Sequence, residues 1–216
     1  MGRTLVVGDL HGCYDELMAL LDAAKFGAED RVVCVGDLVT KGSKSREVLE
    51  LFMADARFAS VLGNHDRALL AYWRGERKKK KLKSAQRKCA KELKDGRERY
   101  AAFLETLPPY VDLGSHVVVH AGLRPGVALA EQSIEDLTEL RTLGPDPASR
   151  EGTPWYEVYD GEKFALFGHW PGAQPRRGPH ALGLDTGCVY GQRLTAYVVE
   201  TGELHSVAAL RAYDKR

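Results

Sequence analysis

The sequence predicts an α/β domain that spans all 216 residues. Two patterns predict this class. In the first third of the chain, short valine-rich runs alternate with amphipathic helical patterns, as in proteins whose parallel strands are joined by helices. In the last third, strand patterns follow one another with only turns between them. A chain of this length is sufficient for one sizeable core and too short to favour two domains.

The composition, 44% hydrophobic and 28% charged residues, is that of an ordinary soluble globular protein. No apolar run approaches the roughly 18 residues that a membrane-spanning helix needs, and no secretory signal precedes the first strand pattern. We therefore expect a cytoplasmic protein with no membrane partner. The four cysteines are widely spaced and form no C-x-x-C pair, which predicts reduced thiols and argues against a disulfide framework or a zinc ribbon. They are Cys13, Cys34, Cys89 and Cys188.

Each of the first three predicted strands ends in polar residues and leads into a helix. The strand and helix ranges are 4–8 with 14–24, 31–36 with 45–53, and 60–63 with a helix from 67. In the first helix, Leu17, Leu20 and Leu21 share one face. In an open α/β sheet, ligands bind at the carboxyl ends of the strands, where loops gather side chains from distant sequence positions. The polar residues at these strand ends are therefore expected to form a site.

The second half of the chain is predicted to be richer in strands. A helix over about 99–107 ends where Pro108-Pro109 breaks the pattern. The runs His116–Gly122 and Lys163–His169 repeat the arrangement of an apolar strand that ends in a polar residue. Two final runs, 194–200 and 204–210, predict an antiparallel pair around the turn at Thr201-Gly202.

Five predicted strand ends present carboxylate, imidazole and amide side chains. In chain order these are Asp9 and His11, Asp37, Asn64 and His65, His120, and His169. A single such residue is usually a turn former or a hydrogen-bonding partner. Five together are hard to explain as independent turns, and these are the ligand types that hold hydrolytic divalent metals. Two metals about 3.5–4 Å apart can bind the attacking and leaving oxygens of an in-line displacement. The sequence therefore predicts one dinuclear hydrolytic site.

The motifs that carry these residues resemble those of the calcineurin-like metallophosphatase superfamily. They are Gly8-Asp9-Leu10-His11-Gly12, Gly36-Asp37-Leu38-Val39-Thr40-Lys41-Gly42, Gly63-Asn64-His65-Asp66, His120-Ala121-Gly122 and Phe167-Gly168-His169. The resemblance implies a metallophosphatase fold, a central β-sandwich flanked by helices in an α/β/β/α arrangement. Two divalent ions are implied as cofactors, with manganese favoured and iron, zinc, cobalt or nickel as alternatives.

Carried over residue by residue, the resemblance implies that Asp9, His11 and Asp37 hold one metal, with Asp37 bridging. The second metal is completed by Asn64, His120 and His169. His65 is implied as the general acid near the leaving group. The cation of the GDxxxRG motif, which grips the phosphate, is here Lys41, which lacks the planar fork of arginine. A second cation is expected from the middle of the chain, and the candidate is Arg141, with a solvated arginine as the alternative.

Within the superfamily, the segment from Phe167 to Trp170 and the run 184–196 resemble the C-terminal signature of bacterial symmetrical dinucleoside tetraphosphatases and their relatives. Thr40 and Asp66 depart from the residues usual in Ser/Thr protein phosphatases. Asp185 is read as a turn former in preference to a residue near the metals. Trp170 and Tyr190 are candidates for stacking on a nucleobase, with core packing as the favoured alternative.

The resemblance implies that the substrate is a nucleotide polyphosphate. The expected reaction splits diadenosine tetraphosphate into two nucleoside diphosphates. Removal of nucleoside-polyphosphate caps from RNA is a related activity. The rivals are a phosphoprotein phosphatase and a non-catalytic RNA-binding module.

Residues 74–99 carry 13 of the 31 basic and only 4 of the 30 acidic residues, so the rest of the chain is acidic. We expect residues 74–107 to form a basic helical cap near the site. It is either a solvated helix face or a surface that attracts polyanions such as the substrate or RNA 5′ ends.

Overall fold

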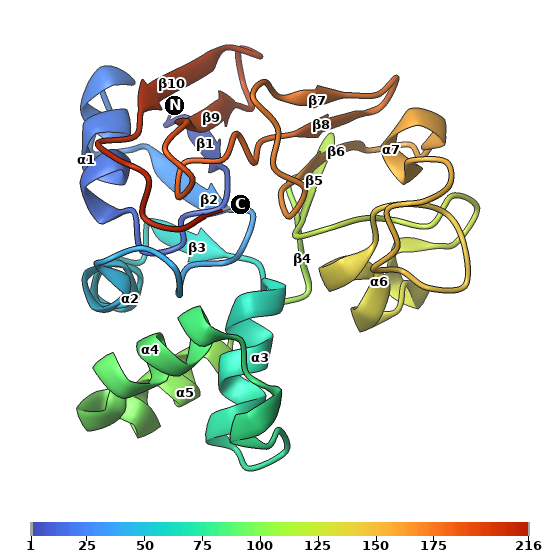
Figure 1. The fold of residues 1–216 in the computed structure, drawn as a ribbon. Coiled ribbons are helices and arrows are strands. Elements are labelled where there is room, and N and C mark those ends of the chain that lie inside the picture. Colours follow the sequence, from blue (N-terminus) through green and yellow to red (C-terminus); the bar gives the residue numbers. More distant parts are fainter. Residues whose placement is uncertain (1, 216) are drawn as a thin grey trace.

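The computed structural model describes residues 2–215 and contains two five-stranded sheets (Figure 1). In the first sheet the order is β10-β9-β1-β2-β3, with β1, β2 and β3 parallel, β9 antiparallel to β1, and β10 antiparallel to β9. Its strands are β1 (Thr4–Val7), β2 (Arg31–Cys34), β3 (Phe58–Ser60), β9 (Arg193–Val198) and β10 (Leu204–Ala208). The predicted antiparallel pair at the end of the chain is confirmed.

The second sheet has the order β4-β5-β6-β8-β7, with β5, β6 and β8 parallel and antiparallel strands at both edges. Its strands are β4 (Tyr110–Asp112), β5 (His116–Val119), β6 (Phe164–Phe167), β7 (Arg176–Arg177) and β8 (Ala181–Gly183). One buried cluster of valine and leucine side chains contains residues of both sheets, among them Val6, Val33, Val118 and Leu166. The two sheets therefore pack face to face through these apolar side chains.

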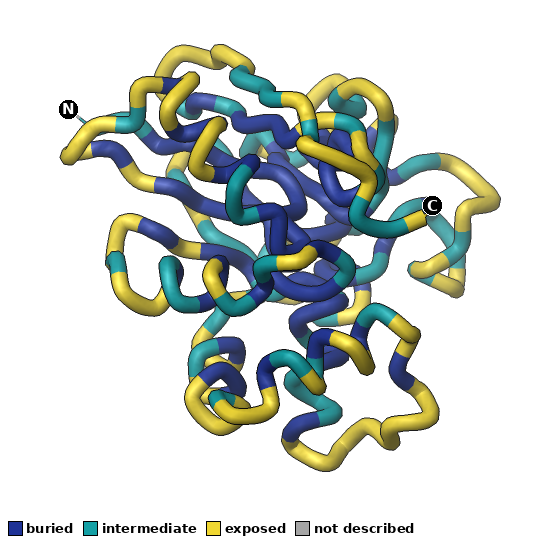
Figure 2. The backbone as a smooth tube through the Cα atoms, turned by 60° about the vertical axis from the view of Figure 1, so that its left-hand side comes forward, coloured by how far each residue is buried: buried dark blue, intermediate teal, exposed yellow. Residues whose placement is uncertain are grey.

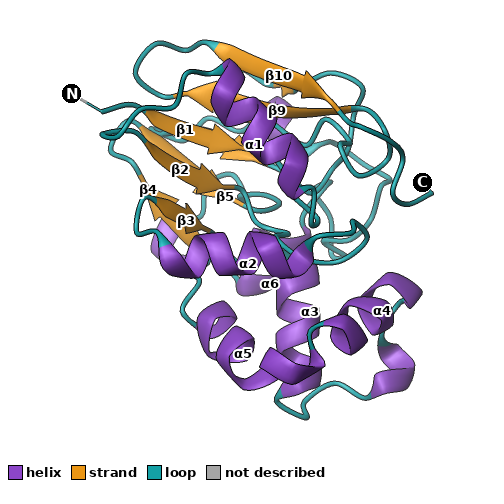
Figure 3. Cartoon of the chain, turned by 90° about the vertical axis from the view of Figure 1, so that its left-hand side faces the viewer, coloured by secondary structure: helices purple, strands orange, loops and turns teal. Residues whose placement is uncertain are grey.

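Helices cover both outer faces of the sandwich. Helices α1 (Tyr14–Ala23) and α2 (Ser45–Ala54) pack on the first sheet (Figure 3). Helices α6 (Ile134–Glu139) and α7 (Trp155–Val158) pack on the second. Leu17, Leu20 and Leu21 are buried as predicted, because their spacing places them on one face of α1. The predicted α/β/β/α sandwich is confirmed.

The basic segment is helical only in part. Helix α3 (Asn64–Trp73) begins three residues earlier than predicted, and α4 (Ser84–Glu92) and α5 (Arg97–Glu105) pack against it. Between α3 and α4 the chain forms turns and the short 3₁₀ helix η1 (Lys79–Lys81), and the other 3₁₀ helices are η2 (Lys94–Gly96) and η3 (Leu129–Glu131). Figure 2 shows the buried backbone concentrated in the sandwich, whereas most of the basic segment is exposed. That residues 74–107 act as a cap of one 216-residue domain stays a prediction.

The four cysteines are free and buried. No helix among residues 2–215 has the length and apolar composition needed to span a bilayer.

The C-terminal segment is held against α1 by a buried carboxylate. Glu16 is 1% exposed, and its Oε1 accepts hydrogen bonds from the backbone N–H of Leu210 at 3.0 Å and the hydroxyl of Tyr213 at 2.8 Å. The N–H of Tyr213 also donates to the carbonyl of Val189 at 2.9 Å. These bonds join the two ends of the chain and fix the segment that leads to Asp214.

We predict that Glu16→Ala lowers the free energy of unfolding by about 2 kcal/mol, because two hydrogen-bond donors lose a charged acceptor in a buried setting. Urea unfolding followed by circular dichroism measures the change. Asp22→Ala, at an exposed position of the same helix, is the control and should change the stability by less than about 0.5 kcal/mol. Equal stabilities of the Glu16 and Asp22 variants would contradict this role of Glu16.

Candidate metal centre

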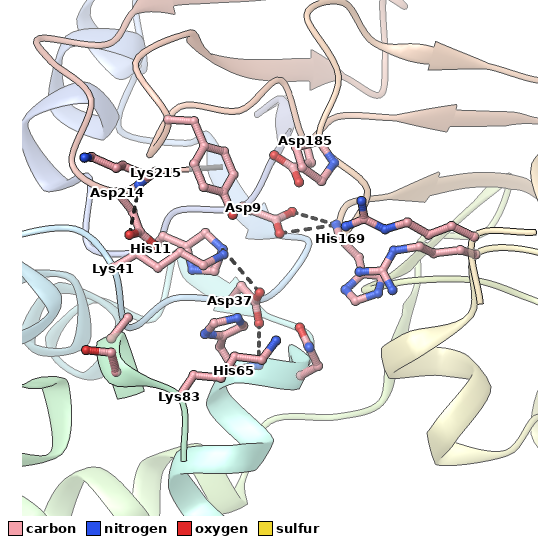
Figure 4. Close-up of a pocket in the computed structure, with 17 residues that line it drawn as sticks. Asp9, His11, Asp37, Lys41, His65, Lys83, His169, Asp185, Asp214 and Lys215 are labelled. Carbon is pink, nitrogen blue, oxygen red and sulfur yellow. Dashed lines mark hydrogen bonds and ion pairs between the residues drawn. The ribbon is translucent and has the colours of Figure 1, made fainter. Parts of the chain in front are cut away.

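A pocket of about 400 Å³ opens where the carboxyl ends of strands from both sheets meet (Figure 4). Five of the six predicted metal ligands line it, together with His65: Asp9, His11, Asp37, Asn64 and His169. The sixth, His120, is fully buried directly behind them, with its Nε2 3.1 Å from Asn64 Oδ1. The first sheet and its loops supply Asp9, Asp37 and Asn64, and the second supplies His120 and His169. The packing of the two sheets therefore brings the predicted residues together.

Asp37 lies at the centre of the cluster. Its carboxylate belongs to two groups of side chains whose ligand atoms all lie within 4.8 Å of one another, one with Asp9 and His120 and the other with His11 and His65. His11 Nε2 is 3.4 Å from Asp37 Oδ2, and His120 Nε2 is 3.6 Å from Asp37 Oδ1. A carboxylate placed between two sets of ligands is suited to bridge two metals.

The backbone orients the imidazoles of the cluster. His11 Nδ1 is 3.1 Å from the carbonyl of Val39, and His120 Nδ1 is 2.9 Å from the carbonyl of Val35. Because a carbonyl only accepts, each Nδ1 carries the proton and leaves the lone pair of Nε2 directed at the cluster. A second hydrogen bond of this kind commonly fixes the tautomer of a metal-ligating histidine.

His169 Nε2 is a buried polar atom that has no hydrogen-bond partner among the described residues. The whole residue is only 6% exposed. Leaving such a group unsatisfied costs about 1–3 kcal/mol, and a metal ion would satisfy it. Together with the carboxylates and oriented imidazoles, this unpartnered nitrogen fits a divalent metal.

The electrostatics of the cluster also favour a cation. Burial raises the pKa of Asp9 well above its usual value, and the neighbouring Asp185 and Asp37 raise it further. Burial lowers the pKa of His11 well below its usual value, and the ammonium of Lys41 adds to this effect. Burial also opposes ionisation of Asp37, but attraction to His120, His65 and Lys41, together with the hydrogen bond from the His65 N–H, outweighs it and the pKa of Asp37 is lowered. A divalent ion would favour both the charged carboxylates and the neutral imidazoles.

The loops that carry the cluster are strained. Only six non-glycine residues among 2–215 have a left-handed backbone, and five of them lie in these loops. Their φ angles are 46° for His11, 55° for Asp37, 76° for Thr40, 64° for Lys41 and 66° for His169. Such conformations cost of order 1 kcal/mol each and persist where surrounding contacts enforce them, commonly at functional sites.

The motif glycines allow the two central carboxylates to pack against the backbone. A Cβ on Gly63 would overlap Asp37 Oδ1, and one on Gly168 would overlap Asp9 Oδ1. Because the carboxylates lie so close to the backbone, they accept hydrogen bonds from it. The N–H of His65 donates to Asp37 at 2.8 Å, and the N–H of His169 donates to Asp9 at 3.0 Å. Glycine is required at these positions because no side chain fits.

Asp66 ties two of the loops together. Its carboxylate accepts from the N–H groups of Leu38, Val39 and Gly63, each at 3.2 Å, and the residue is fully buried. Burial raises its pKa to about 8. From the sequence, Asp66 was only a departure from another family pattern, but here it fixes the loop after β2 against the start of α3.

The predicted general acid, His65, lies at the start of α3 and faces the pocket. Its Nδ1 is 2.6 Å from the hydroxyl of Thr40. In the sequence, Thr40 stood out only as a departure from the residue usual in Ser/Thr protein phosphatases, and the structure places its hydroxyl in contact with the imidazole. A neutral hydroxyl orients the ring without adding a second negative charge beside Asp37.

The predicted phosphate-binding cations also line the pocket. Lys41 Nζ lies 2.7 Å from His11 Nε2 and 5.2 Å from the centre of the Tyr190 ring, and Tyr190 lines the pocket beside it. Arg141 Nη1 donates to the carbonyl of Ala148 at 3.3 Å, and its Nε is buried without a partner among residues 2–215. Arg141 is half-buried and lines the pocket, and its part in binding phosphate stays a prediction.

Trp170 does not line this pocket. Its ring packs 5.9 Å from that of Tyr156 and 4.6 Å from the guanidinium of Arg176, beside the core of the second sheet. This position disagrees with contact between Trp170 and a nucleobase in the pocket. Core packing, the favoured alternative, explains this residue.

Sequence reasoning did not single out Arg150 and Lys215 of the pocket, it placed Lys83 only within the basic segment, and it favoured a turn for Asp185. Asp185 Oδ1 accepts from the N–H of Gly187 at 3.1 Å, so the predicted turn exists, but the carboxylate also faces the pocket. The signal was available, because Asp185 follows the apolar strand β8 in the same way that Asp9 follows β1. No local pattern marked Arg150 or Lys215, and none distinguished Lys83 from the other lysines of the basic segment.

These features define a metallophosphoesterase. A family model described as calcineurin-like phosphoesterase matches residues 2–202, and the chain belongs to that family, whose members use a dinuclear divalent metal centre.

The chain is similar over nearly its whole length to named dinucleotide hydrolases. It is 30% identical to bis(5′-nucleosyl)-tetraphosphatase PrpE [asymmetrical] of Bacillus subtilis, across 97% of this chain and 96% of the relative. It is 29% identical to the symmetrical bis(5′-nucleosyl)-tetraphosphatase of Vibrio campbellii, across 96% and 99%. A crystal structure of a protein assigned as a diadenosine tetraphosphatase superposes with a TM-score of 0.82 at 32% identity, covering 96% of this chain and 94% of that one.

We predict that the manganese-reconstituted protein binds two metal ions per chain and that Asp37→Ala binds at most one, because Asp37 belongs to both ligand groups. Plasma mass spectrometry after gel filtration measures the metal content. Asp214→Ala removes a carboxylate that lines the same pocket outside the cluster, and it should retain two ions. Two metals in the Asp37 variant, confirmed as folded by circular dichroism, would rule out the bridging role.

Proposed function

We propose that this chain hydrolyses dinucleoside polyphosphates, and that it splits diadenosine tetraphosphate symmetrically into two nucleoside diphosphates with two divalent ions, manganese being favoured. The observation that carries the proposal is one pocket that combines a buried ligand cluster with a rim of positive charge. The names of the relatives support this substrate class.

The charge of the pocket divides into two zones. Three carboxylates, those of Asp9, Asp37 and Asp185, lie at the strand ends where the ligands gather. Outside this zone the pocket has a single carboxylate, Asp214, against five cationic side chains. The five are Lys41, Lys83, Arg141, Arg150 and Lys215. A rim of this charge is complementary to a substrate with several phosphates and exceeds what one phosphate needs.

We infer the following ligand sets. Asp9, His11 and Asp37 would hold one metal, and Asp37, Asn64, His120 and His169 would hold the second. When bound, such a pair supplies Lewis acidity and lowers the pKa of a water molecule toward neutrality. His11 Nε2 cannot ligate a metal and contact Lys41 at once, so metal binding would release the Lys41 ammonium toward the substrate phosphate.

The remaining groups would bind and protonate the substrate. Lys41 and Arg141 both line the pocket and would offset the negative charge that develops at phosphorus. His65, oriented by Thr40, would donate a proton to the departing oxygen. Tyr190, whose ring contacts Lys41, would fix the ammonium and lies where a substrate group can contact it.

The position of cleavage is tested by product analysis. We expect the manganese-loaded protein to convert diadenosine tetraphosphate to ADP as the sole nucleotide product, resolved by ion-exchange chromatography. Equimolar ATP and AMP would establish the asymmetrical cleavage for which one of the similar proteins is named. Phosphotyrosine and phosphoserine peptides are incubated in parallel. An inert dinucleotide together with phosphate release from the peptides would overturn the proposal in favour of a phosphoprotein phosphatase.

The role of His65 is tested by changing the leaving group. His65→Ala should lower kcat on diadenosine tetraphosphate by about 10²–10⁴-fold, because its nucleotide leaving group gains from protonation. On a p-nitrophenyl phosphodiester, whose leaving group departs without a proton, the loss should be at least tenfold smaller. Thr40→Val should show the same pattern with a smaller loss, and Thr40→Ser should restore activity by returning the hydroxyl. Equal losses on both substrates would refute protonation by His65.

A further inference from the structure

Lys83 and Arg150 belong to the cationic rim of the pocket, but neither is assigned to a metal, to the phosphate at the metal centre or to the leaving group. We propose that they form a second phosphate-binding subsite, an outer pair that binds a phosphate group beyond the one held at the metal centre. The subsite would make the pocket selective for chains of phosphates over single phosphates. The identification of the natural ligand as a dinucleotide rests on the proposed function, whereas the binding chemistry of the outer pair does not.

Lys83 is held in place by its backbone while its charge stays unpaired. It is the N-cap of α4, and its N–H donates to the side-chain oxygen of the buried Gln86 at 2.8 Å. The preceding carbonyl, that of Leu82, accepts from Arg87 Nη1. The Lys83 ammonium is exposed, lines the pocket and makes no ion pair or hydrogen bond within residues 2–215 (Figure 4).

Arg150 is held beside Arg141 by the fold of its loop. The N–H of Arg141 donates to the carbonyl of Pro147 at 3.0 Å, and the hydroxyl of Thr142 donates to the carbonyl of Glu151 at 2.8 Å. These bonds fold the segment around Arg150 back onto the strand-like segment at Arg141. The Arg150 side chain lines the pocket and has no carboxylate partner in the described part of the chain.

The two arginines repel each other in the absence of an anion. Burial lowers the pKa of the Arg141 guanidinium, and the charge of Arg150 lowers it further. Placing like charges together without a counterion is unfavourable unless a ligand compensates for it. A guanidinium can bind phosphate oxygens through two parallel N–H groups, so an anionic phosphate is the ligand that best fits Arg150.

Lys83 and Arg150 reach the pocket from different parts of the fold. Lys83 comes from the helices that pack on α3, and Arg150 comes from the connection between α6 and α7 beside the second sheet (Figure 1). They therefore bring positive charge to the same pocket from two separate segments of the chain. Cations spaced around a metal centre match a chain of linked phosphates that extends from it.

The test measures binding by isothermal titration calorimetry, with inorganic tripolyphosphate and orthophosphate as probes of the manganese-loaded full chain. Wild type should bind tripolyphosphate at least about 100-fold more tightly than orthophosphate. Lys83→Ala/Arg150→Ala should weaken tripolyphosphate binding by at least about tenfold and change orthophosphate binding by less than about twofold. The charge-matched control is Lys79→Ala/Lys80→Ala, which removes two exposed cations of the same helical region outside this pocket and should leave both affinities within twofold.

An unchanged tripolyphosphate affinity in the Lys83/Arg150 variant, or an equal loss for both probes, would overturn the outer pair. An equal loss in the Lys79/Lys80 control would also overturn it, because net charge would then explain the effect. Failure of the proposed function has a different signature. In that case the calorimetric preference for tripolyphosphate persists in wild type, but diadenosine tetraphosphate is not cleaved.

Discussion

The structure depends on the burial of several carboxylates at the edge where the two sheets meet. Asp37 is 2% exposed and Asp9 is 4% exposed, and each faces the other as well as Asp185. Such a cluster is tolerated because its carboxylates accept hydrogen bonds from the backbone N–H groups of His65 and His169. The strained loops hold these N–H groups in position. The glycines of the motifs, the left-handed backbone and the tie through Asp66 are consequences of this requirement. A chain that only needed to fold would place apolar residues here.

The sequence predicted the fold and the composition of the cluster because both depend on local patterns. A valine-rich run that ends in Gly-Asp marks a strand and the loop after it, and this pattern recurs at Asp9 and Asp37. Since parallel strands end at the same edge, the repeated pattern was sufficient to expect the polar residues in one place. The structure brings all six predicted ligands and His65 together. Their roles in binding metal and substrate stay predictions.

What the sequence could not predict depends on contacts between distant segments. Arg150 lies in a loop without regular structure, and its position follows from hydrogen bonds of the Thr142 hydroxyl to the carbonyls of Ser149 and Glu151 that no periodicity reveals. Lys83 looked like any other member of a basic run until helix packing placed it at the pocket. Trp170 illustrates the reverse case, because this aromatic follows His169 in the sequence yet is partly buried against the core of the second sheet and does not line the pocket, in agreement with the favoured alternative. Proximity in sequence to a site residue is thus weak evidence of proximity in space.

The charge asymmetry of the chain has a simple physical explanation if the substrate is a polyphosphate. Outside residues 74–99 the chain has more acidic than basic residues, and the ligand cluster itself adds buried carboxylates. Two divalent ions would compensate for the charge at the centre, but their field would be strong only at short range in a hydrated pocket. A polyanion approaching from outside would still meet the acidic body of the protein. Cations at the rim, contributed by the basic segment and by the loop at Arg150, would remove that barrier and orient the phosphate chain before it contacts the metals.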